Sequence, residues 1–315
     1  MGTAQQMGKF TPNLANVSQP LRDLLSSKNQ WMWTEIHTTA FEKIKTLLAS
    51  PQTLKLYDVN KPTKLRVDAS KLNGMSVILY QSDKNEWHPV TCASRYLTSA
   101  EKNYFPIELE MQAVTWGCEK MNVYLQGLHH FTVQTDHKPL IPIINTKQLV
   151  DMSPRIQAMR MKQMKYSFTA EYVKGTDLQD ADAFSRAPTE QPSTKDVLTE
   201  DDISAHVSAV ITNMPASTNK IQQIKQQVTK DETLQLVINT MTQGWPPTRA
   251  ECNQLVKPFW DSRFELTVVD GLLLKGSRIV IPKRMQTDML NRIHTGHMGI
   301  ERSKRRADRT YSGPI

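Results

Sequence analysis

The 315-residue sequence has little cysteine and no long hydrophobic run. Its three cysteines, Cys92, Cys118 and Cys252, are far apart and never form a Cys-x-x-Cys pair. Scattered cysteines in an odd number argue against a disulfide framework and against a complete zinc site, so we expect an intracellular, reducing compartment, either the cytoplasm or the nucleus. No apolar segment approaches the roughly 20 residues that a membrane-spanning helix needs, and no secretory signal opens the chain, so we expect no membrane partner.

The sequence also lacks the glycine-rich motifs of nucleotide-binding folds and any internal repeat. Its content of 39% hydrophobic and 22% charged residues is typical of globular proteins, and the chain is long enough for two modest domains. Its formal net charge of +8 favours a polyanionic partner such as a nucleic acid, although charge alone leaves that choice open.

Hydrophobic periodicity predicts an α/β fold. Residues 11–50 are predicted to be helical, with an apolar stripe at Phe41, Ile44, Leu47 and Leu48. Three short segments rich in β-branched and aliphatic residues follow, which predicts an antiparallel meander. A capping box at 98–101 is predicted to open a long helix, after which strands and helices alternate, as in a mixed sheet with helices packed over it. The predicted strands are 65–67, 75–80, 90–93, 131–135 and 169–173, and the later helices begin near 139, 155 and 178.

The composition changes after the last of these helices. Residues 188–218 are rich in Pro, Ser, Thr and acidic residues without a sustained apolar period, which predicts a linker. An amphipathic helical region and a hairpin turned by Asp270-Gly271 then predict a small α+β unit at 219–315.

Carboxylates stand at the ends of two predicted strands and on the last helix. Asp68 and Asp136 each follow a strand, a placement that suits a metal site, but either one alone could simply cap the turn that follows it. The acids Asp177 and Asp180 fit the favourable start of a helix. Asp182 fits that interpretation less well, because it shares a face with Leu178.

The long helix adds another candidate. Glu108 and Glu110 lie two residues apart and therefore point in different directions. Glu108 leads a more polar face, whereas Glu110 leads the apolar stripe of Ala113, Val114 and Gly117. A carboxylate on the core side of a helix is costly unless a cation compensates it, so we favour a functional carboxylate over a solvated one at Glu110.

Four motifs occur in order along this region: Val-Asp-Ala-Ser at 67–70, Glu-Leu-Glu-Met-Gln-Ala-Val at 108–114, Thr-Asp-His-Lys-Pro-Leu at 135–140 and Ala-Asp-Ala-Phe-Ser-Arg at 181–186. Together they resemble the ribonuclease H domain of gypsy-type long-terminal-repeat retrotransposons. The flanks resemble the end of a reverse transcriptase and the segment that leads into an integrase zinc-binding domain. The resemblance implies a reverse transcriptase thumb- or connection-like segment at 1–62, a ribonuclease H-like domain at 63–187, the linker at 188–218 and a truncated integrase zinc-binding-like region at 219–315.

The resemblance implies a ribonuclease H-like mixed five-stranded sheet with flanking helices, with catalytic, metal-binding carboxylates at Asp68, Glu110, Asp136 and Asp182. An oxygen-only ligand set suits Mg²⁺ or Mn²⁺ rather than zinc. The implied activity is metal-dependent hydrolysis of the RNA strand of RNA/DNA hybrids, and other polyprotein products are further expected partners. The alternative is a catalytically silent or host-adopted remnant that binds nucleic acid through the same fold.

Two further groups of residues are candidates with plain alternatives. Arg155, Arg160, Lys162 and Lys165 are four cations without an acid, which favours either a rail for nucleic-acid phosphates or a solvated face. His137, beside Asp136, is either an auxiliary group for proton transfer or product release, or an exposed loop histidine.

Two activities of a complete polyprotein are not expected. No Asp-Asp pair lies upstream of the ribonuclease H region, as a polymerase palm would need, so we do not expect polymerase activity. His294 and His297 resemble the histidine half of a His-His-Cys-Cys zinc module, but no cysteine follows Cys252, so we expect an incomplete zinc half-site.

Overall fold

The computed structural model describes residues 17–24, 31–48, 56–214, 216–294 and 311–312. Near the N-terminus, α3 (Gln19–Leu24) packs on α4 (Glu35–Leu48) through a small apolar cluster around Ile44. Ile44 is buried as predicted, but Phe41 is 46% exposed, so the predicted stripe is wrong at that position. The side chains of Leu47 and Leu48 lie outside the described residues.

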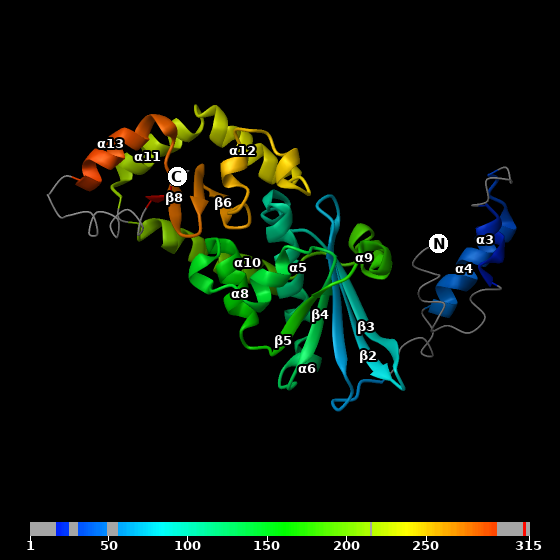
Figure 1. Ribbon diagram of the computed structural model, residues 1–315. Coiled ribbons are helices and arrows are strands. Elements are labelled where there is room, and N and C mark those ends of the chain that lie inside the picture. The colour runs from blue at the N-terminus through cyan, green and yellow to red at the C-terminus, as the bar shows by residue number, and fades with distance from the viewer. Residues whose placement is uncertain (1–16, 25–30, 49–55, 215, 295–310, 313–315) are drawn as a thin grey trace. The chain divides into compact units, whose positions relative to one another are not determined.

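Strands β1 to β5 form a five-stranded mixed sheet (Figure 1). Its strands follow the order β3-β2-β1-β4-β5. The first three strands in the sequence pair antiparallel, whereas β4 and β5 join in parallel. This confirms the predicted mixed sheet and its opening meander. The elements are β1 (Thr63–Ala69), β2 (Gly74–Asp83), β3 (Glu86–Tyr96), α5 (Pro106–Lys120), α6 (Asn122–Leu125), β4 (Phe131–Thr135), α7 (Leu140–Asn145), β5 (Phe168–Tyr172) and α9 (Gln179–Arg186).

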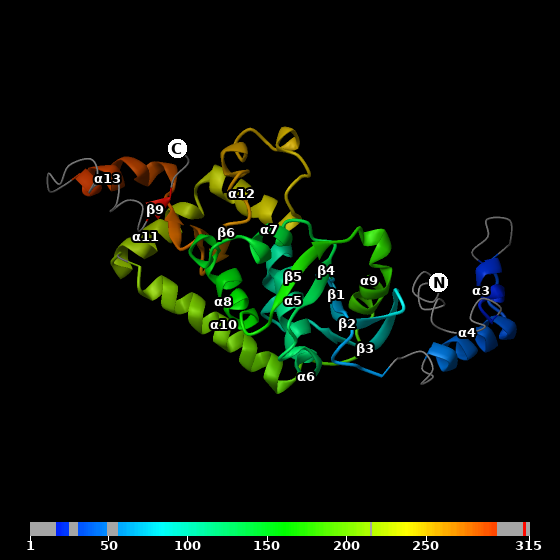
Figure 2. The same ribbon diagram turned by 60° about the horizontal axis from the view of Figure 1, so that its bottom comes forward.

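Helices cover both faces of this sheet (Figure 2). On β2, Val77 lies against α5, and the next residue, Ile78, packs with Ala181 of α9. Successive strand residues point to opposite faces, so α5 and α9 lie on opposite sides of the sheet. Gly117 lets α5 approach closely, because a Cβ at this position would stand 3.0 Å from Val67 and 3.1 Å from Val77.

The chain divides into two compact units that do not follow the predicted domain boundaries. Helix α5 runs without a break from the second unit into the first. Parts of the predicted 63–187 domain therefore belong to each unit. The first unit contains the described residues of 1–98, 113–141 and 165–192, and the second contains those of 99–112, 142–164 and 193–315.

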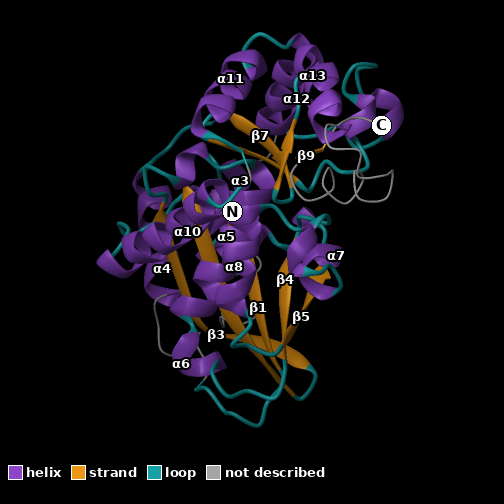
Figure 3. Cartoon of the chain, turned by 90° about the vertical axis from the view of Figure 1, so that its left-hand side faces the viewer, coloured by secondary structure: helices purple, strands orange, loops and turns teal. Residues whose placement is uncertain are grey.

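The second unit has its own sheet, of order β6-β7-β8-β9, and its own apolar core, in which Ile224, Val237 and Leu273 are fully buried. The hairpin turned by Asp270-Gly271 is confirmed, and Figure 3 shows α11, α12 and α13 beside the strands.

Across the described part of the chain, no helix is both long and apolar enough to cross a membrane.

The elements of the second unit are α8 (Pro154–Gln163), α10 (Thr194–Thr212), α11 (Thr218–Val228), α12 (Glu232–Gln243), β6 (Leu266–Val269), β7 (Leu272–Lys275), β8 (Arg278–Val280), α13 (Lys283–His294) and β9 (Tyr311–Ser312).

Helix α10 occupies most of the segment that was predicted to be a linker, so the linker prediction is wrong there. A capping box formed by Ser193 and Asp196 starts the helix. Its buried positions include Ile203 but also Thr199 and Glu200. Two polar residues on the buried face conceal the apolar period from which a helix would be predicted.

Helix α5 begins later than predicted. The predicted capping box at 98–101 is wrong, because this segment leads into a short 3-10 turn, Glu101–Asn103, and α5 starts at Pro106. Proline suits the first helical position, since it has no N–H to satisfy. The side chain of Glu108, in the first turn, accepts a hydrogen bond from the Phe105 N–H at 3.1 Å and so caps the helix.

Candidate active site

Three of the four predicted carboxylates meet at one edge of the five-stranded sheet. Asp68 lies near the end of β1, and Asp136 directly follows β4, which runs parallel to β1. Parallel neighbouring strands end at the same edge, so the topology brings these two acids together. Glu110 stands on α5, which Gly117 holds close to this sheet. Among the described residues, these three acids each offer one oxygen, and all three oxygens lie within 4.8 Å of one another.

Asp68 is the buried member of this carboxylate cluster (Asp68, Glu110 and Asp136), with 6% of its surface exposed. Burial is the main cause that raises its pKa to about 6. The Ser185 hydroxyl donates a hydrogen bond to Asp68 Oδ2 and opposes that rise, whereas the charges of Asp136 and Asp182 add to it. A site that disfavours its own negative charge in this way is stabilised by a cation.

Asp136 is the exposed member of the cluster. Its pKa is raised, first by partial burial and then by the charge of Asp182. The backbone of Gly175 comes close to this carboxylate, because a Cβ on Gly175 would stand 3.1 Å from Asp136 Oδ2. Any side chain at position 175 would therefore press on one of the cluster's oxygens.

Asp182, the fourth predicted carboxylate, lies beside the cluster without belonging to it. Its charge acts on both Asp68 and Asp136, which places it nearby. Its own carboxylate is paired with Arg186 one helical turn later, at 2.7 Å, and is 40% exposed. The structure therefore brings three of the predicted acids together and leaves Asp182 at the margin in an ion pair.

His137 is not the exposed loop histidine that was one of its two interpretations. Its Nε2 atom is buried and has no hydrogen-bond partner within the described part of the chain. Burial lowers the pKa of the imidazole to about 4. The ring is therefore neutral at pH 7.

Sequence reasoning missed the role of Ser185, which contacts Asp68 from α9. Ser185 is fully buried, and its hydroxyl also lies 2.9 Å from the carbonyl oxygen of Asp182. The sequence could have indicated this role, because Ser185 lies in the motif at 181–186, three residues after the predicted catalytic acid Asp182 and on the same face of the helix.

The more polar face of α5 is also buried. Glu108 is 1% exposed and forms an ion pair with Arg155 of α8, whose Nη1 lies 2.9 Å from Glu108 Oε1. Arg155 is therefore engaged inside the second unit. An internal carboxylate already pairs with it, and a role in phosphate binding stays a prediction.

The other three predicted cations have different surroundings. Arg160 donates to the carbonyl oxygen of Ile144 at 3.3 Å, and Lys162 pairs with Asp202 of α10 at 2.8 Å. Lys165 is exposed and lies beyond the end of α8, with its Nζ 5.1 Å from the centre of the Tyr166 ring. Of the four predicted cations, Lys165 is exposed and the other three are half-buried, and their binding to nucleic-acid phosphates stays a prediction.

The predicted zinc half-site falls almost entirely outside the described residues. His294 ends α13, but its side chain is not described, and His297 lies outside the described ranges.

The carboxylate cluster fits a hard divalent cation. Its donors are carboxylate oxygens, without histidine or cysteine, which is the ligand chemistry that Mg²⁺ and Mn²⁺ prefer. The raised pKa of Asp68 agrees with this, since the acid that suffers most from burial would gain most from a bound cation.

Comparison with known proteins agrees with this fold. A family model described as the RNase H-like domain found in reverse transcriptase matches residues 33–133. The Retrovirus-related Pol polyprotein from transposon 412 of Drosophila melanogaster is 34% identical over 178 residues, which are 56% of this chain and 14% of that protein. The Transposon Tf2-3 polyprotein of Schizosaccharomyces pombe is 30% identical over 198 residues, 62% of this chain and 15% of that protein.

Solved structures show weaker likeness. A foamy viral protease-reverse transcriptase in complex with double-stranded DNA is 22% identical, with a TM-score of 0.43 over 55% of this chain and 33% of that one. RNase H1 from the archaeon Halobacterium salinarum is 14% identical, with a TM-score of 0.31 over 39% of this chain and 92% of that one. Scores this low carry no further argument.

The mixed five-stranded sheet is that of a ribonuclease H-like fold. The chain contains an RNase H-like domain of the reverse transcriptase type, and its homologues are retrotransposon polyproteins, as the four motifs predicted. A gypsy-type retrotransposon fits these relatives. The chain spans about one seventh of the length of the curated relatives it matches.

Proposed function

We propose that this chain carries a metal-dependent endonuclease that hydrolyses the RNA strand of RNA/DNA hybrids. The observation that supports this function best is the carboxylate cluster, whose three oxygens lie within 4.8 Å of one another at the edge of a ribonuclease H-like sheet. The reverse transcriptase context of the matched family supports an RNA/DNA hybrid as the substrate.

Asp68, Glu110 and Asp136 would hold Mg²⁺ or Mn²⁺, with Asp182 beside them. When bound, the metal would activate a water and stabilise the departing 3′ oxygen at an RNA phosphate. The chain's own residues prepare the site. Ser185 fixes the Asp68 carboxylate by donating to it, and α5 presents Glu110 from the helical layer. Lys165 and partner proteins from the same polyprotein remain proposed contacts of the wider complex.

The test is cleavage of an RNA/DNA hybrid with a labelled RNA strand, in Mg²⁺, in Mn²⁺ and in a chelator. We expect metal-dependent cuts in the RNA strand, with a 5′ phosphate on the downstream product. The same RNA as a single strand and as an RNA duplex serves as the specificity control. If the hybrid is bound but not cut in either metal, the chain is a silent binding module and the nuclease proposal fails.

A further inference from the structure

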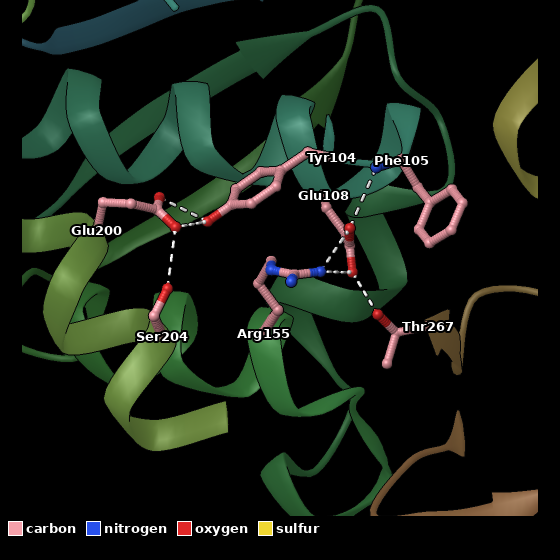
Figure 4. A network of polar contacts seen from close by, with 7 residues as sticks. All are labelled: Tyr104, Phe105, Glu108, Arg155, Glu200, Ser204 and Thr267. Atoms are coloured by element: carbon pink, nitrogen blue, oxygen red, sulfur yellow. Dashed lines mark hydrogen bonds and ion pairs between the residues drawn. The ribbon is translucent and has the colours of Figure 1, made fainter. Parts of the chain in front are cut away.

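A buried polar network holds the first turn of α5 (Figure 4). Glu108 is its centre, with 1% of its surface exposed. Nη1 of Arg155 lies 2.9 and 3.0 Å from the two carboxylate oxygens of Glu108. The hydroxyl of Thr267 donates to Glu108 Oε1 at 2.6 Å, and the Phe105 N–H donates to Oε2 at 3.1 Å. The acid thus receives donors from α8, from β6 and from its own helix start.

The same network continues to α10. The guanidinium of Arg155 lies over the Tyr104 ring, 4.6 Å from its centre. The Tyr104 hydroxyl donates to Glu200 of α10 at 2.6 Å, and the Ser204 hydroxyl lies 3.3 Å from the same carboxylate. Figure 4 shows these side chains pointing toward one another. Two of the elements that carry them, α10 and β6, come from the part of the chain after residue 192.

The start of α5 matters because Glu110 is two residues after Glu108. Two residues of an α-helix turn by about 200° and rise by about 3 Å, so the two acids lie on nearly opposite faces of one turn. Asp68 and Asp136 are held by paired strands. Glu110 is the member of the cluster that comes from a helix, and the turn that carries it is fixed by Glu108 on its other face.

The position of the first turn of α5 depends on the hydrogen bonds that Glu108 accepts. A buried carboxylate is tolerated only while its donors remain in place, and removing one donor leaves part of its charge uncompensated. Glu108 has four hydrogen bonds from three partners, so its position depends on Arg155 and Thr267 together. A shift of the acid would move the turn that carries Glu110.

We propose that Glu108, held by Arg155 and Thr267, is a positioning residue that aims Glu110 into the carboxylate cluster. On this proposal, β6 contributes to the nuclease site through the Thr267 hydroxyl on Glu108, and α10 holds Tyr104, just before α5, through Glu200. The predicted effect on metal binding rests on the proposed function. The claim that Glu108 and its partners fix the first turn of α5 does not.

The test uses the full chain with Thr267→Val, which keeps the β-branched shape of the side chain and removes the hydroxyl. Hydrogen exchange of the amides in 105–112 and calorimetric titration with Mg²⁺ are the two readouts. We expect faster exchange in this segment and Mg²⁺ binding weakened about tenfold, in the range seen when outer groups that orient metal ligands are removed. Thr267→Ser, which keeps the hydroxyl, should restore both.

Thr240→Val is the matched control, because the Thr240 hydroxyl hydrogen bonds only along its own helix, to the Leu236 carbonyl at 2.8 Å. It should change neither readout. Exchange and Mg²⁺ binding equal to wild type in Thr267→Val would overturn the positioning role. Failure of the wild type itself to bind Mg²⁺ would overturn the proposed function, and the exchange measurement would still decide whether Thr267 holds α5.

Discussion

Replacing Asp68 with asparagine should stabilise the metal-free chain while it abolishes cleavage. Asp68 is 6% exposed, and burial raises its pKa from an ordinary 3.8 to about 6. A rise of about two pKa units corresponds to about 3 kcal/mol by which folding disfavours the charged carboxylate at neutral pH. Asparagine keeps the shape, carries no charge and can still accept the hydrogen bond from Ser185, so most of this penalty should disappear.

The sign of the pH dependence follows from the raised pKa. Below pH 3.8, Asp68 is protonated in both the folded and the unfolded chain and costs nothing. Stability is then lost as pH rises through the window from 3.8 to about 6, and the full penalty remains above it. The gain in free energy of unfolding from Asp68→Asn should therefore be present at pH 7.5 and nearly absent near pH 3.

Denaturant unfolding of the first unit in the presence of a chelator measures this gain, and thermal unfolding should show it at about 2–4 °C per kcal/mol. Asp177→Asn, which changes an exposed acid on the turn before α9, is the control and should give no gain in stability, but at most the loss of about 0.3–1 kcal/mol expected for a charge at a helix start. If Asp68→Asn is less stable than wild type at pH 7.5, Asp68 is a structural acid and the reasoning from burial is refuted.

Three other changes probe the same site. Gly175→Ala should weaken Mg²⁺ binding several-fold without loss of stability, because its Cβ would stand 3.1 Å from Asp136 Oδ2; unchanged binding by calorimetry would contradict this. Ser185→Ala removes a hydrogen bond to a charged acceptor, worth about 1.5–3 kcal/mol, and should therefore raise the pKa of Asp68 further. The acidic limb of the pH profile of cleavage should then move to higher pH, whereas Ser94→Ala, which changes a buried serine outside the site, should leave the profile unchanged. In the wild type, Mg²⁺ affinity should fall as the pH drops below about 6, because Asp68 must lose its proton to bind the metal. An affinity that does not change between pH 5 and 8 would exclude Asp68 as a ligand.

The sheet was predictable because its signals are local. Strands such as 75–80 are rich in β-branched and aliphatic residues, and the Asp270-Gly271 pair favours a tight hairpin turn, so both were recognised from the sequence. The start of α5 was misplaced because the residue that caps it, Glu108, is a glutamate in the first turn without a serine or threonine before it. Helix α10 was missed because Glu200, on its buried face, has its hydrogen-bond partner Tyr104 almost one hundred residues away.

The carboxylate cluster was predictable for a related reason. Asp68 and Asp136 follow strands whose order in the sheet is fixed by topology, and Glu110 was singled out by the helical face on which it stands. The environment of each acid was not predictable. Neither the burial that raises the pKa of Asp68 nor the partner that occupies Arg155 leaves a mark in the local sequence, since both depend on segments distant in the chain.

Cleavage of an RNA/DNA hybrid by the wild type, Asp68→Asn and Glu110→Gln, each confirmed as folded, tests the central claim most directly. We predict metal-dependent cutting of the RNA strand by the wild type, and a loss of at least about a hundredfold in both variants, because each removes a charged ligand from the cluster. Cutting that persists in either variant would show that the activity does not come from the Asp68, Glu110 and Asp136 site, and would contradict the account.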